Sequence, residues 1–244
     1  MIRATALAML AWTAPAWAVE CETTTHDGNS YAICSVDLST DNLRLFLYDD
    51  DGAVFGQFSA IERELRTKGL RLGFAMNAGM YHNDRAPVGH YVENGEEVMR
   101  VLPNAGPGNF GLLPNGVLCI RDSRVDVIET LRFVDQAPEC AYATQSGPML
   151  VIDGELHPRF LVDSTSRYVR NGVGTSADGK RAVFAISDSP VTFHEFGRLY
   201  RDHLDMPNAL FLDGNISRLY APDLNRSDFG FSLGPIVGTV EAAD

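Results

Sequence analysis

The stretch VGHYVENGEEVMRV, residues 88–101, reads as two short strands joined by a tight turn. The turn falls at Asn94-Gly95, a pair that accepts the positive φ angles of a two-residue hairpin loop. Repetition of this design predicts a sheet of mostly antiparallel strands. Two further hairpins are expected at GNFGLLPNGVLCI (108–120), turning at Asn115-Gly116, and at GPMLVIDGELH (147–157), turning at Asp153-Gly154.

Other segments on both sides of these hairpins have the short apolar or alternating pattern of strands. They are residues 31–38, 43–49, 70–81, 181–187 and 209–214. A helix is predicted over residues 59–68, because Ser59 and Glu62 have the spacing of a capping box and Gly69 follows as a stop residue.

A second helix is predicted from Thr192, which forms the capping-box pattern with Glu195, to about Leu204. Its apolar residues recur at three- and four-residue steps, so one face is expected to be buried. Lying between two predicted strands, this helix resembles a crossover connection. The fold class is therefore α+β: a mixed, mostly antiparallel multi-stranded sheet with a few helices, in a single domain over residues 19–244.

Composition excludes some classes of function. The chain has 244 residues and a formal net charge of −12. Nucleic-acid binding needs a basic face for the phosphates, so no nucleic-acid partner is expected. The same charge disfavours docking on an anionic membrane.

The first 18 residues, MIRATALAMLAWTAPAWA, are predicted to be a cleavable signal peptide. They combine one basic residue, Arg3, with a short apolar run and the small-x-small sequence Ala16-Trp17-Ala18. No later segment approaches the roughly 18 apolar residues that a membrane span requires. The protein is therefore expected to be periplasmic or secreted, with no membrane span.

The four cysteines agree with export, because an even number in an exported chain favours disulfides. Four cysteines allow three pairings, and Cys21–Cys34 with Cys119–Cys140 is the simplest. A zinc site is the alternative, but the tight spacing it would need is absent.

Polar residues gather where apolar strands end in glycine-flanked turns. Such loops are where rigid scaffolds present chemistry, although each residue also has an ordinary structural explanation in turns or surface charge. The segments are 76–82, 144–148, 166–172 and 213–217. From these residues alone we infer only a polar site.

Several of these segments resemble motifs of the phosphodiester glycosidase family, which includes an enzyme that removes N-acetylglucosamine from a mannose phosphodiester. NAGMY (77–81) is similar to an N-G-G-Y/F motif, RNGVG (170–174) to R-x-A-x-G, and LFLDGNIS (210–217) to N-L-D-G-G-G-S-S. TQSGPMLVIDG (144–154) resembles the family's central stretch. The resemblance covers about residues 70–222, in the order expected, and looks like a bacterial branch of the family.

Two departures from the family pattern concern glycines. The triple glycine of the late motif is Gly214-Asn215-Ile216 here, and the first glycine of the early motif is Ala78. The substrate can therefore differ from that of the enzyme described above.

The resemblance implies hydrolysis of a sugar-1-phosphodiester at the anomeric carbon, through a transition state that carboxylates stabilise. Asp213 is the lead carboxylate, as nucleophile or general base, and Asp188 is the second. Arg170 is the expected phosphate clamp, with Arg167 as a second one, because a guanidinium binds two phosphate oxygens. The residues expected to bind the substrate or a water are Asn77, Gln145, Ser146, Gly214, Asn215 and Ser217.

Three other functions stay open at this point: a non-catalytic envelope protein that binds glycans or phosphodiesters, a phosphodiesterase that cuts the P–O bond, and a purely structural partner protein. The polar residues at the strand ends favour the structural protein least. The expected partner of the enzyme or the binding protein is a glycan or sugar phosphodiester. The sequence requires no cofactor. Calcium would suit the aspartates and carbonyls of these loops, although no loop has the spacing of a known calcium motif.

Overall fold

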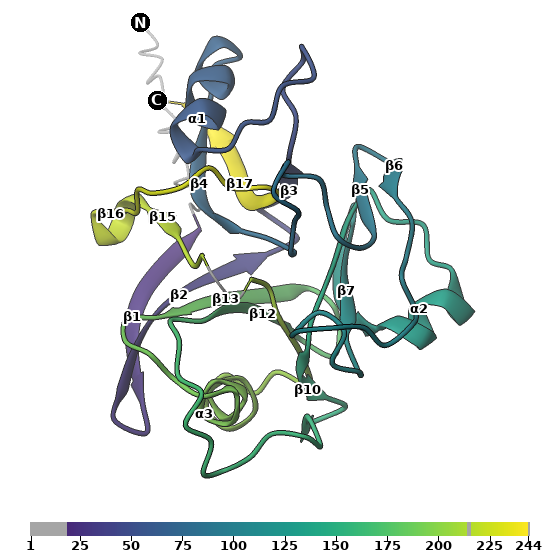
Figure 1. Cartoon of the computed structure of the whole chain (residues 1–244). Coiled ribbons are helices and arrows are strands. Elements are labelled where there is room, and N and C mark those ends of the chain that lie inside the picture. Colours follow the sequence, from purple (N-terminus) through teal and green to yellow (C-terminus); the bar gives the residue numbers. More distant parts are fainter. Residues whose placement is uncertain (1–18, 214–215, 244) are drawn as a thin grey trace, which may run out of the picture.

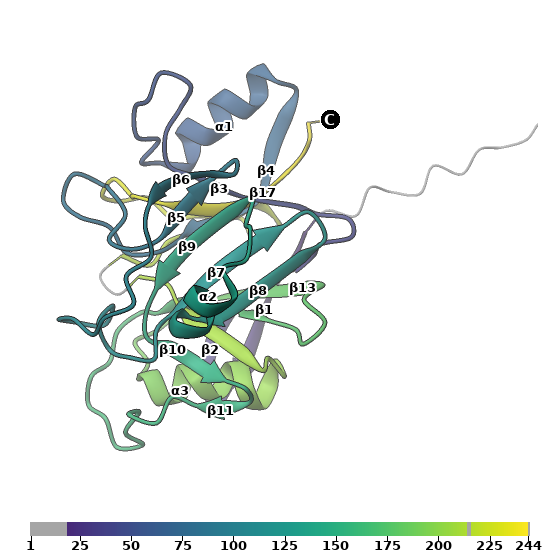
Figure 2. The ribbon, with the colours of Figure 1, turned by 90° about the vertical axis from the view of Figure 1, so that its right-hand side faces the viewer.

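The structure is a computed structural model that describes residues 19–213 and 216–243. The described chain forms three sheets that face a common core, and a helix covers the outer side of each sheet (Figures 1 and 2). The predicted α+β fold, mostly antiparallel, is confirmed. The predicted signal peptide, residues 1–18, lies outside the described residues, and no helix of the described part is long and apolar enough to cross a membrane.

The first sheet has seven strands in the order β1-β2-β13-β12-β14-β10-β11. Their bounds are β1 Glu20–His26, β2 Asn29–Asp37, β10 Met149–Ile152, β11 Glu155–Leu156, β12 Asn171–Thr175, β13 Arg181–Ser187 and β14 Asn208–Phe211. Helix α3 (Phe193–Arg198), continued by a π-helical turn over Leu199–His203, packs on its outer face through Phe196, Leu199 and Tyr200.

The second sheet has the order β16-β15-β4-β17-β3, and the third has the order β6-β5-β9-β7-β8. In the second sheet the bounds are β3 Asn42–Phe46, β4 Leu70–Asn77, β15 Leu219–Ala221, β16 Arg226–Ser227 and β17 Ile236–Ala242. In the third they are β5 Tyr91–Glu93, β6 Glu96–Met99, β7 Gly116–Arg121, β8 Arg124–Glu129 and β9 Tyr142–Ser146. Helix α1 (Phe58–Thr67) covers the second sheet, α2 (Thr130–Gln136) contacts β7 and β8, and a 3₁₀ turn spans Pro222–Leu224.

The core where the sheets meet is apolar and contains residues of all three. The Phe74 ring of β4 lies 5.0 Å, centroid to centroid, from the Phe184 ring of β13, and Leu118 of β7 belongs to the same buried cluster. Burial of large apolar side chains is the main favourable contribution to folding. The three sheets are therefore parts of one domain.

Two of the three predicted hairpins are confirmed. Asn94-Gly95 has φ angles of 53° and 80°, and Asp153-Gly154 has 49° and 86°, as two-residue turns of this kind require. The hairpin predicted at Asn115-Gly116 is wrong. Gly116 begins β7, which pairs with β8 around residues 122–123, while the Asn115 amide is buried and donates to the Phe110 carbonyl at 2.7 Å.

Of the two predicted capping boxes, one is confirmed and the other is wrong. The capping box of Thr192 and Glu195 is present at the start of α3. The box predicted for Ser59 and Glu62 is wrong, because α1 begins after Gln57 and no side chain caps it. The Glu62 carboxylate instead accepts the Leu72 N–H of β4 at 2.6 Å, which ties the helix to the sheet.

The crossover through α3 is present, but its two strands are not neighbours. β13 and β14 both pair antiparallel with β12, which lies between them. This places the start of β12 beside the end of β14, and the residues of two predicted motifs become adjacent.

Both predicted disulfides are confirmed. Cys21–Cys34 joins directly opposed residues of β1 and β2, and Cys119–Cys140 joins β7 to the segment before β9. Each closes a loop, which restricts the unfolded chain and stabilises the folded state.

Candidate active site

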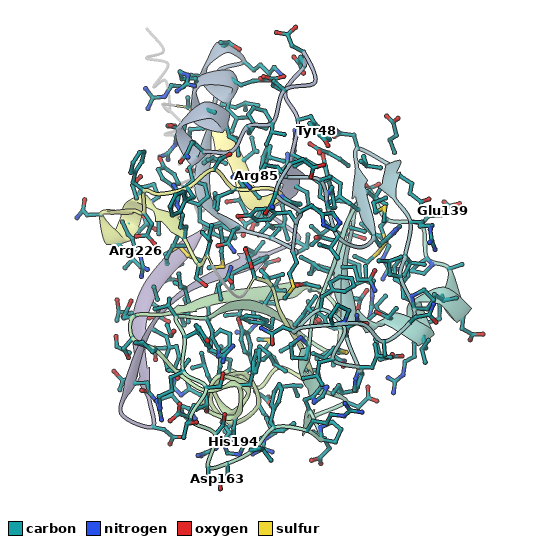
Figure 3. The ribbon with its side chains drawn as sticks, in the orientation of Figure 1. Tyr48, Arg85, Glu139, Asp163, His194 and Arg226 are labelled. Carbon is teal, nitrogen blue, oxygen red and sulfur yellow. A yellow bond between two sulfur atoms is a disulfide. The ribbon has the colours of Figure 1, made fainter. Side chains whose placement is uncertain are left out.

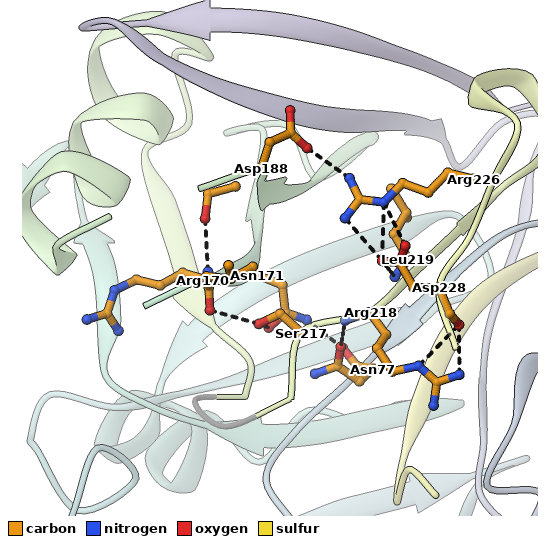
Figure 4. A network of polar contacts seen from close by, with 11 residues as sticks. Asn77, Arg170, Asn171, Asp188, Ser217, Arg218, Leu219, Arg226 and Asp228 are labelled. Carbon is orange, nitrogen blue, oxygen red and sulfur yellow. Dashed lines mark hydrogen bonds and ion pairs between the residues drawn. The ribbon is translucent and has the colours of Figure 1, made fainter. Parts of the chain in front are cut away.

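Three segments that are far apart in the sequence meet at one point, between the first and second sheets (Figure 4). They are the end of β4 at Asn77, the start of β12 at Asn171, and the segment that follows β14. The Asn171 amide donates to the Asn77 carbonyl at 3.0 Å, and its Oδ1 accepts the Asp213 N–H at 3.3 Å. The Asn77 Oδ1 accepts the Arg218 N–H at 2.8 Å.

The main chain near Asp213 is held by two serine side chains, the buried Ser146 and the half-buried Ser217. The Ser146 hydroxyl donates to the Leu212 carbonyl. The Ser217 hydroxyl donates to the Val169 carbonyl at 3.1 Å and lies 3.4 Å from Asn171 Oδ1. Buried polar groups that are hydrogen-bonded in this way specify one geometry. Gly214 and Asn215, which are predicted to bind substrate, lie outside the described residues.

Tyr81 is next to this cluster. Its hydroxyl is buried and has no hydrogen-bond partner among the described groups. Burial raises the Tyr81 pKa, and the negative charge of Asp213 raises it further, whereas the cations Arg85 and Arg218 act in the opposite direction. The tyrosine therefore stays protonated, and its hydroxyl can donate a hydrogen bond.

Arg85 brings a positive charge to the same place. Its guanidinium carbon lies 5.5 Å from the centre of the Tyr81 ring. Arg85 has φ of 75°, an uncommon conformation for a residue other than glycine. Figure 3 shows Arg85 on the side of the second sheet, above the first.

Asp188 follows β13 and belongs to the network drawn in Figure 4. Its carboxylate accepts the Ser30 hydroxyl at 2.6 Å and pairs with Arg226 at 3.0 Å. Arg226 also pairs with Asp228, which accepts the Leu219 N–H at 2.9 Å. Asp188 therefore supports the segment that follows Ser217, and its catalytic role stays a prediction.

The Arg170 side chain does not face the cluster. Successive side chains of a strand point to opposite faces, so Arg170 and Asn171 face opposite ways (Figure 4). The Arg170 guanidinium is 3.6 Å from the centre of the Phe193 ring and donates to the carbonyls of Val191 and Ser166. The residue is 1% exposed, and burial lowers its pKa to about 10.

The other predicted ligands are also engaged elsewhere. Arg167 pairs with Glu195 at 2.6 Å, beside the start of α3. The buried Gln145 amide accepts the N–H groups of His90 and Leu102 and donates to the Leu102 carbonyl. The structure thus brings together Asn77, Ser217 and Asp213, with Ser146 behind them, but not the side chains of Arg170, Arg167 and Gln145. The phosphate clamp by arginines 167 and 170 stays a prediction.

Sequence reasoning missed Asn171, Tyr81 and Arg85 as members of the site. Asn171 and Tyr81 lie within the segments that carry the family resemblance, so their position in the motifs could have identified them. For Asn171, the alternation of side chains along a strand could also have shown that it faces away from Arg170. Arg85 had no local signal, because its proximity to Tyr81 results from a loop conformation.

No group of three or more His, Cys, Asp or Glu side chains in the described parts of the chain could hold a metal ion. Calcium also accepts main-chain carbonyl and amide oxygens, and its binding stays a prediction.

A cavity of about 920 Å³ opens elsewhere, beside the third sheet. Its lining includes His90, Arg121 and Phe133, and none of the cluster around Asp213. Its volume therefore does not mark the candidate site.

Comparison with known families gives a match over most of the chain. The family described as phosphodiester glycosidase matches residues 71–230. The uncharacterized protein YigE of Escherichia coli (strain K12) is 32% identical over 186 residues, which are 76% of this chain and 72% of that protein.

Two solved structures share the fold. One is the catalytic domain of zebrafish N-acetylglucosamine-1-phosphodiester alpha-N-acetylglucosaminidase, auto-inhibited by its pro-peptide, with a TM-score of 0.59 and 14% identity over 91% of this chain and 81% of that one. The other is a hypothetical protein from Synechocystis, with a TM-score of 0.59 and 12% identity over 91% of this chain and 61% of that one. At such identities the likeness concerns the fold alone.

Proposed function

The chain belongs to the phosphodiester glycosidase family, and from this premise we propose that it hydrolyses a sugar-1-phosphodiester at the glycosidic C–O bond. One observation carries the proposal. Asn77, Asn171 and Asp213, one from each of three segments that resemble family motifs, lie together: the Asn171 amide donates to the Asn77 carbonyl and accepts the Asp213 N–H, and the Asn77 amide oxygen accepts the Arg218 N–H.

In the proposed reaction the bond between the anomeric carbon and the phosphate oxygen breaks, and the electron pair leaves with the phosphate. Asp213 stabilises the positive charge that develops on the sugar, either as a nucleophile or as the base that takes a proton from the attacking water. Asp188 is the proposed second carboxylate. A phosphate monoester is a good leaving group, so a strong general acid is less necessary.

The phosphate would lie beside Tyr81 and Arg85. The Arg85 guanidinium can bind two phosphate oxygens, and the neutral Tyr81 hydroxyl can donate a hydrogen bond to a third. This arrangement gives the substrate an electropositive site within a protein of net charge −12. The two disulfides fit an oxidising compartment, and we propose that the protein acts in the periplasm or after secretion.

The test is Asp213→Asn, measured as kcat/KM on N-acetylglucosamine-1-phosphodiesters. We expect a fall of about 10²- to 10⁴-fold, the usual contribution of a positioned acid, base or nucleophile. Asp223→Asn, an exposed aspartate in the 3₁₀ turn, is the matched control and should keep wild-type activity. A folded Asp213→Asn protein with full turnover would refute the assignment.

Hydrolysis in ¹⁸O-labelled water identifies the bond that is cut. Cleavage of the C–O bond places the heavy oxygen in the sugar, whereas cleavage of the P–O bond places it in the phosphate. The second result would make the protein a phosphodiesterase. The absence of turnover on sugar phosphodiesters that nevertheless bind would indicate a non-catalytic glycan-binding protein.

A further inference from the structure

A cavity of about 130 Å³ lies between the second and third sheets, beside α1. Its lining includes Glu93 at the end of β5, Tyr48 after β3 and Tyr142 at the start of β9. Figure 3 shows Tyr48 between the two sheets. One water needs about 10–15 Å³ of such space, so the cavity has room for a small molecule. It shares no residue with the cluster around Asp213.

The Glu93 carboxylate in this cavity has no cationic partner. It accepts the Tyr91 hydroxyl at 2.9 Å and the Leu47 N–H. In the part of the chain that the structure describes, no Lys, Arg or His forms an ion pair with it. A carboxylate offers about four sites for hydrogen bonds, so about two remain for a ligand. A carboxylate removed from water is stable when a positive charge accompanies it, and such a charge would suit Glu93.

The two cations that line the cavity have partners of their own. Lys68 of α1 pairs with Glu64 at 2.8 Å and with Asp50 at 3.3 Å. The Arg44 Nε on β3 donates to the Asn42 side chain at 2.9 Å. The lining thus contains two cations and three carboxylates, and it carries a net negative charge when Glu93 is ionised.

Aromatic rings form much of the remaining lining. They belong to Phe46, Tyr48, Phe55 and Tyr142. The Phe55 ring packs edge-on against that of Phe46, with 6.4 Å between their centres, which holds both rings in place. The faces of aromatic rings attract cations, because their electron density is negative. The lining therefore combines a carboxylate with rings that suit a small organic cation.

The Tyr142 hydroxyl and the Glu93 carboxylate can act on one ligand. Burial is the main cause that raises the Tyr142 pKa, Arg44 lowers it, and the charge of Glu93 raises it further, so the two groups are close. The Tyr142 hydroxyl donates to Asn94 Oδ1 at 2.7 Å, which fixes the ring. Its oxygen can still accept a hydrogen bond.

We propose that this cavity binds a primary alkylammonium ion, whose charge pairs with the Glu93 carboxylate. The ammonium donates to the carboxylate and to the Tyr142 oxygen, and the short alkyl chain packs against the aromatic rings. A primary ammonium suits this lining better than a quaternary one, because its three N–H donors match the oxygens present. The inference goes beyond the proposed function and does not depend on it, since the two sites share no residue.

Calorimetric titration of the full-length protein with n-propylammonium chloride at pH 8 tests the proposal. The ligand stays charged at this pH, as lysine does. We expect saturable binding with a Kd of roughly 0.1–10 mM, which is typical of so small a ligand. The uncharged 1-propanol should bind at least about 10-fold more weakly, because it lacks the charge.

Two glutamate variants form a matched pair. Glu93→Gln should lower the affinity for propylammonium roughly 10- to 100-fold, the usual effect of losing a hydrogen bond between charged groups. Glu22→Gln, which alters an exposed glutamate of β1, should change the affinity less than about 2-fold. Arg44→Gln removes a like charge from the lining and should bind propylammonium at least as tightly as wild type.

Proton release gives a readout that a purely structural Glu93 would not produce. Burial raises the Glu93 pKa to about 7, and an ammonium binds the ionised form. The affinity should therefore fall about 10-fold per pH unit below pH 7, and binding at pH 6 should release about one proton. The other charged groups of the lining, Arg44, Asp50, Glu64 and Lys68, have the partners described above. Titrations in buffers of different ionisation enthalpy measure the released proton on wild-type protein, so they are decisive even if Glu93→Gln does not fold.

A second ligand identifies the source of the ammonium. Nα-acetyl-lysine amide carries the same group on a peptide-like unit, and binding tighter than that of propylammonium would indicate a lysine side chain of a polypeptide rather than a free amine. The site is refuted if propylammonium gives no saturable heat at high millimolar concentration, if 1-propanol binds equally well, or if binding at pH 6 releases no proton. An unchanged affinity in Glu93→Gln, or weaker binding in Arg44→Gln, would also contradict the pairing. No readout uses turnover, so failure of the proposed hydrolysis would leave these results unaffected.

Discussion

At the scale of single residues, the neighbours Arg170 and Asn171 show how a strand assigns different environments to adjacent side chains. Asn171 faces the cluster around Asp213, whereas Arg170 is enclosed beneath α3 with carbonyl groups and the Phe193 ring. A buried guanidinium that donates to main-chain carbonyls and stacks on an aromatic ring contributes to stability through both contacts. The motif alone suggested that Arg170 binds the phosphate. The variant Arg170→Ala can distinguish that role from a role in stability.

We expect Arg170→Ala to lower the free energy of unfolding by about 3 kcal/mol, because it leaves a cavity and removes the donors to buried carbonyls. Urea denaturation measures the change. Arg159→Ala, which alters an exposed arginine, is the control and should lie within about 0.5 kcal/mol of wild type. If Arg170 also binds the phosphate, the folded variant should show a large fall in kcat/KM. An unchanged free energy of unfolding would contradict the enclosed position of the Arg170 side chain.

At the scale of secondary-structure elements, two helices with the same sequence signature begin in different ways. Thr192 accepts the Glu195 N–H at 3.1 Å, and the Glu195 carboxylate accepts the Thr192 N–H at 2.8 Å. In α1 the corresponding glutamate, Glu62, faces β4 and is bonded to Leu72, so it is unavailable as a cap. In α1 a hydrogen bond to the neighbouring strand has therefore replaced the hydrogen bond of a capping box.

These two helices give a matched pair of substitutions. Thr192→Ala should destabilise the protein by about 1 kcal/mol, because it removes the side-chain cap of α3. Ser59→Ala should have little effect, since Ser59 is exposed and lies within the first turn of α1. Thermal and urea unfolding of the two variants measure the difference, and equal losses would contradict the assigned starts.

At the scale of the whole molecule, Glu93 links the second and third sheets. It lies at the end of β5, where it accepts the Tyr91 hydroxyl at 2.9 Å and the main-chain N–H of Leu47, just after β3. It also lines a cavity of about 130 Å³ with Tyr48 and Tyr142, and Tyr48 lies between the two sheets in Figure 3. Burial raises the Glu93 pKa to about 7, although both hydrogen bonds act to lower it.

The raised pKa predicts how stability depends on pH. Between about pH 4.5 and pH 7 the folded protein binds the Glu93 proton more tightly than the unfolded chain does, so the free energy of unfolding falls as the pH rises. We expect a loss of roughly 2 to 3 kcal/mol from this residue by pH 8. Urea denaturation at several pH values measures the slope, and Glu93→Gln should flatten it. An identical slope in the variant would contradict the prediction.

The amino-acid sequence by itself determined the features that depend on near neighbours. The turns at Asn94-Gly95 and Asp153-Gly154 follow from the φ angles those residues accept, and the cap of α3 follows from groups three residues apart. Cys21–Cys34 and Cys119–Cys140 pair within short loops. The order of the polar motifs also indicated the family.

Only the tertiary structure decided which of these groups meet. The bond between Asn171 and Asn77 joins residues 94 positions apart, and the Arg218 guanidinium reaches Gln57 across 161 positions. Such contacts form when three sheets bury a common core, and no local preference encodes them. For the same reason the burial of Arg170 and the proximity of Arg85 to Tyr81 became visible only in the folded molecule.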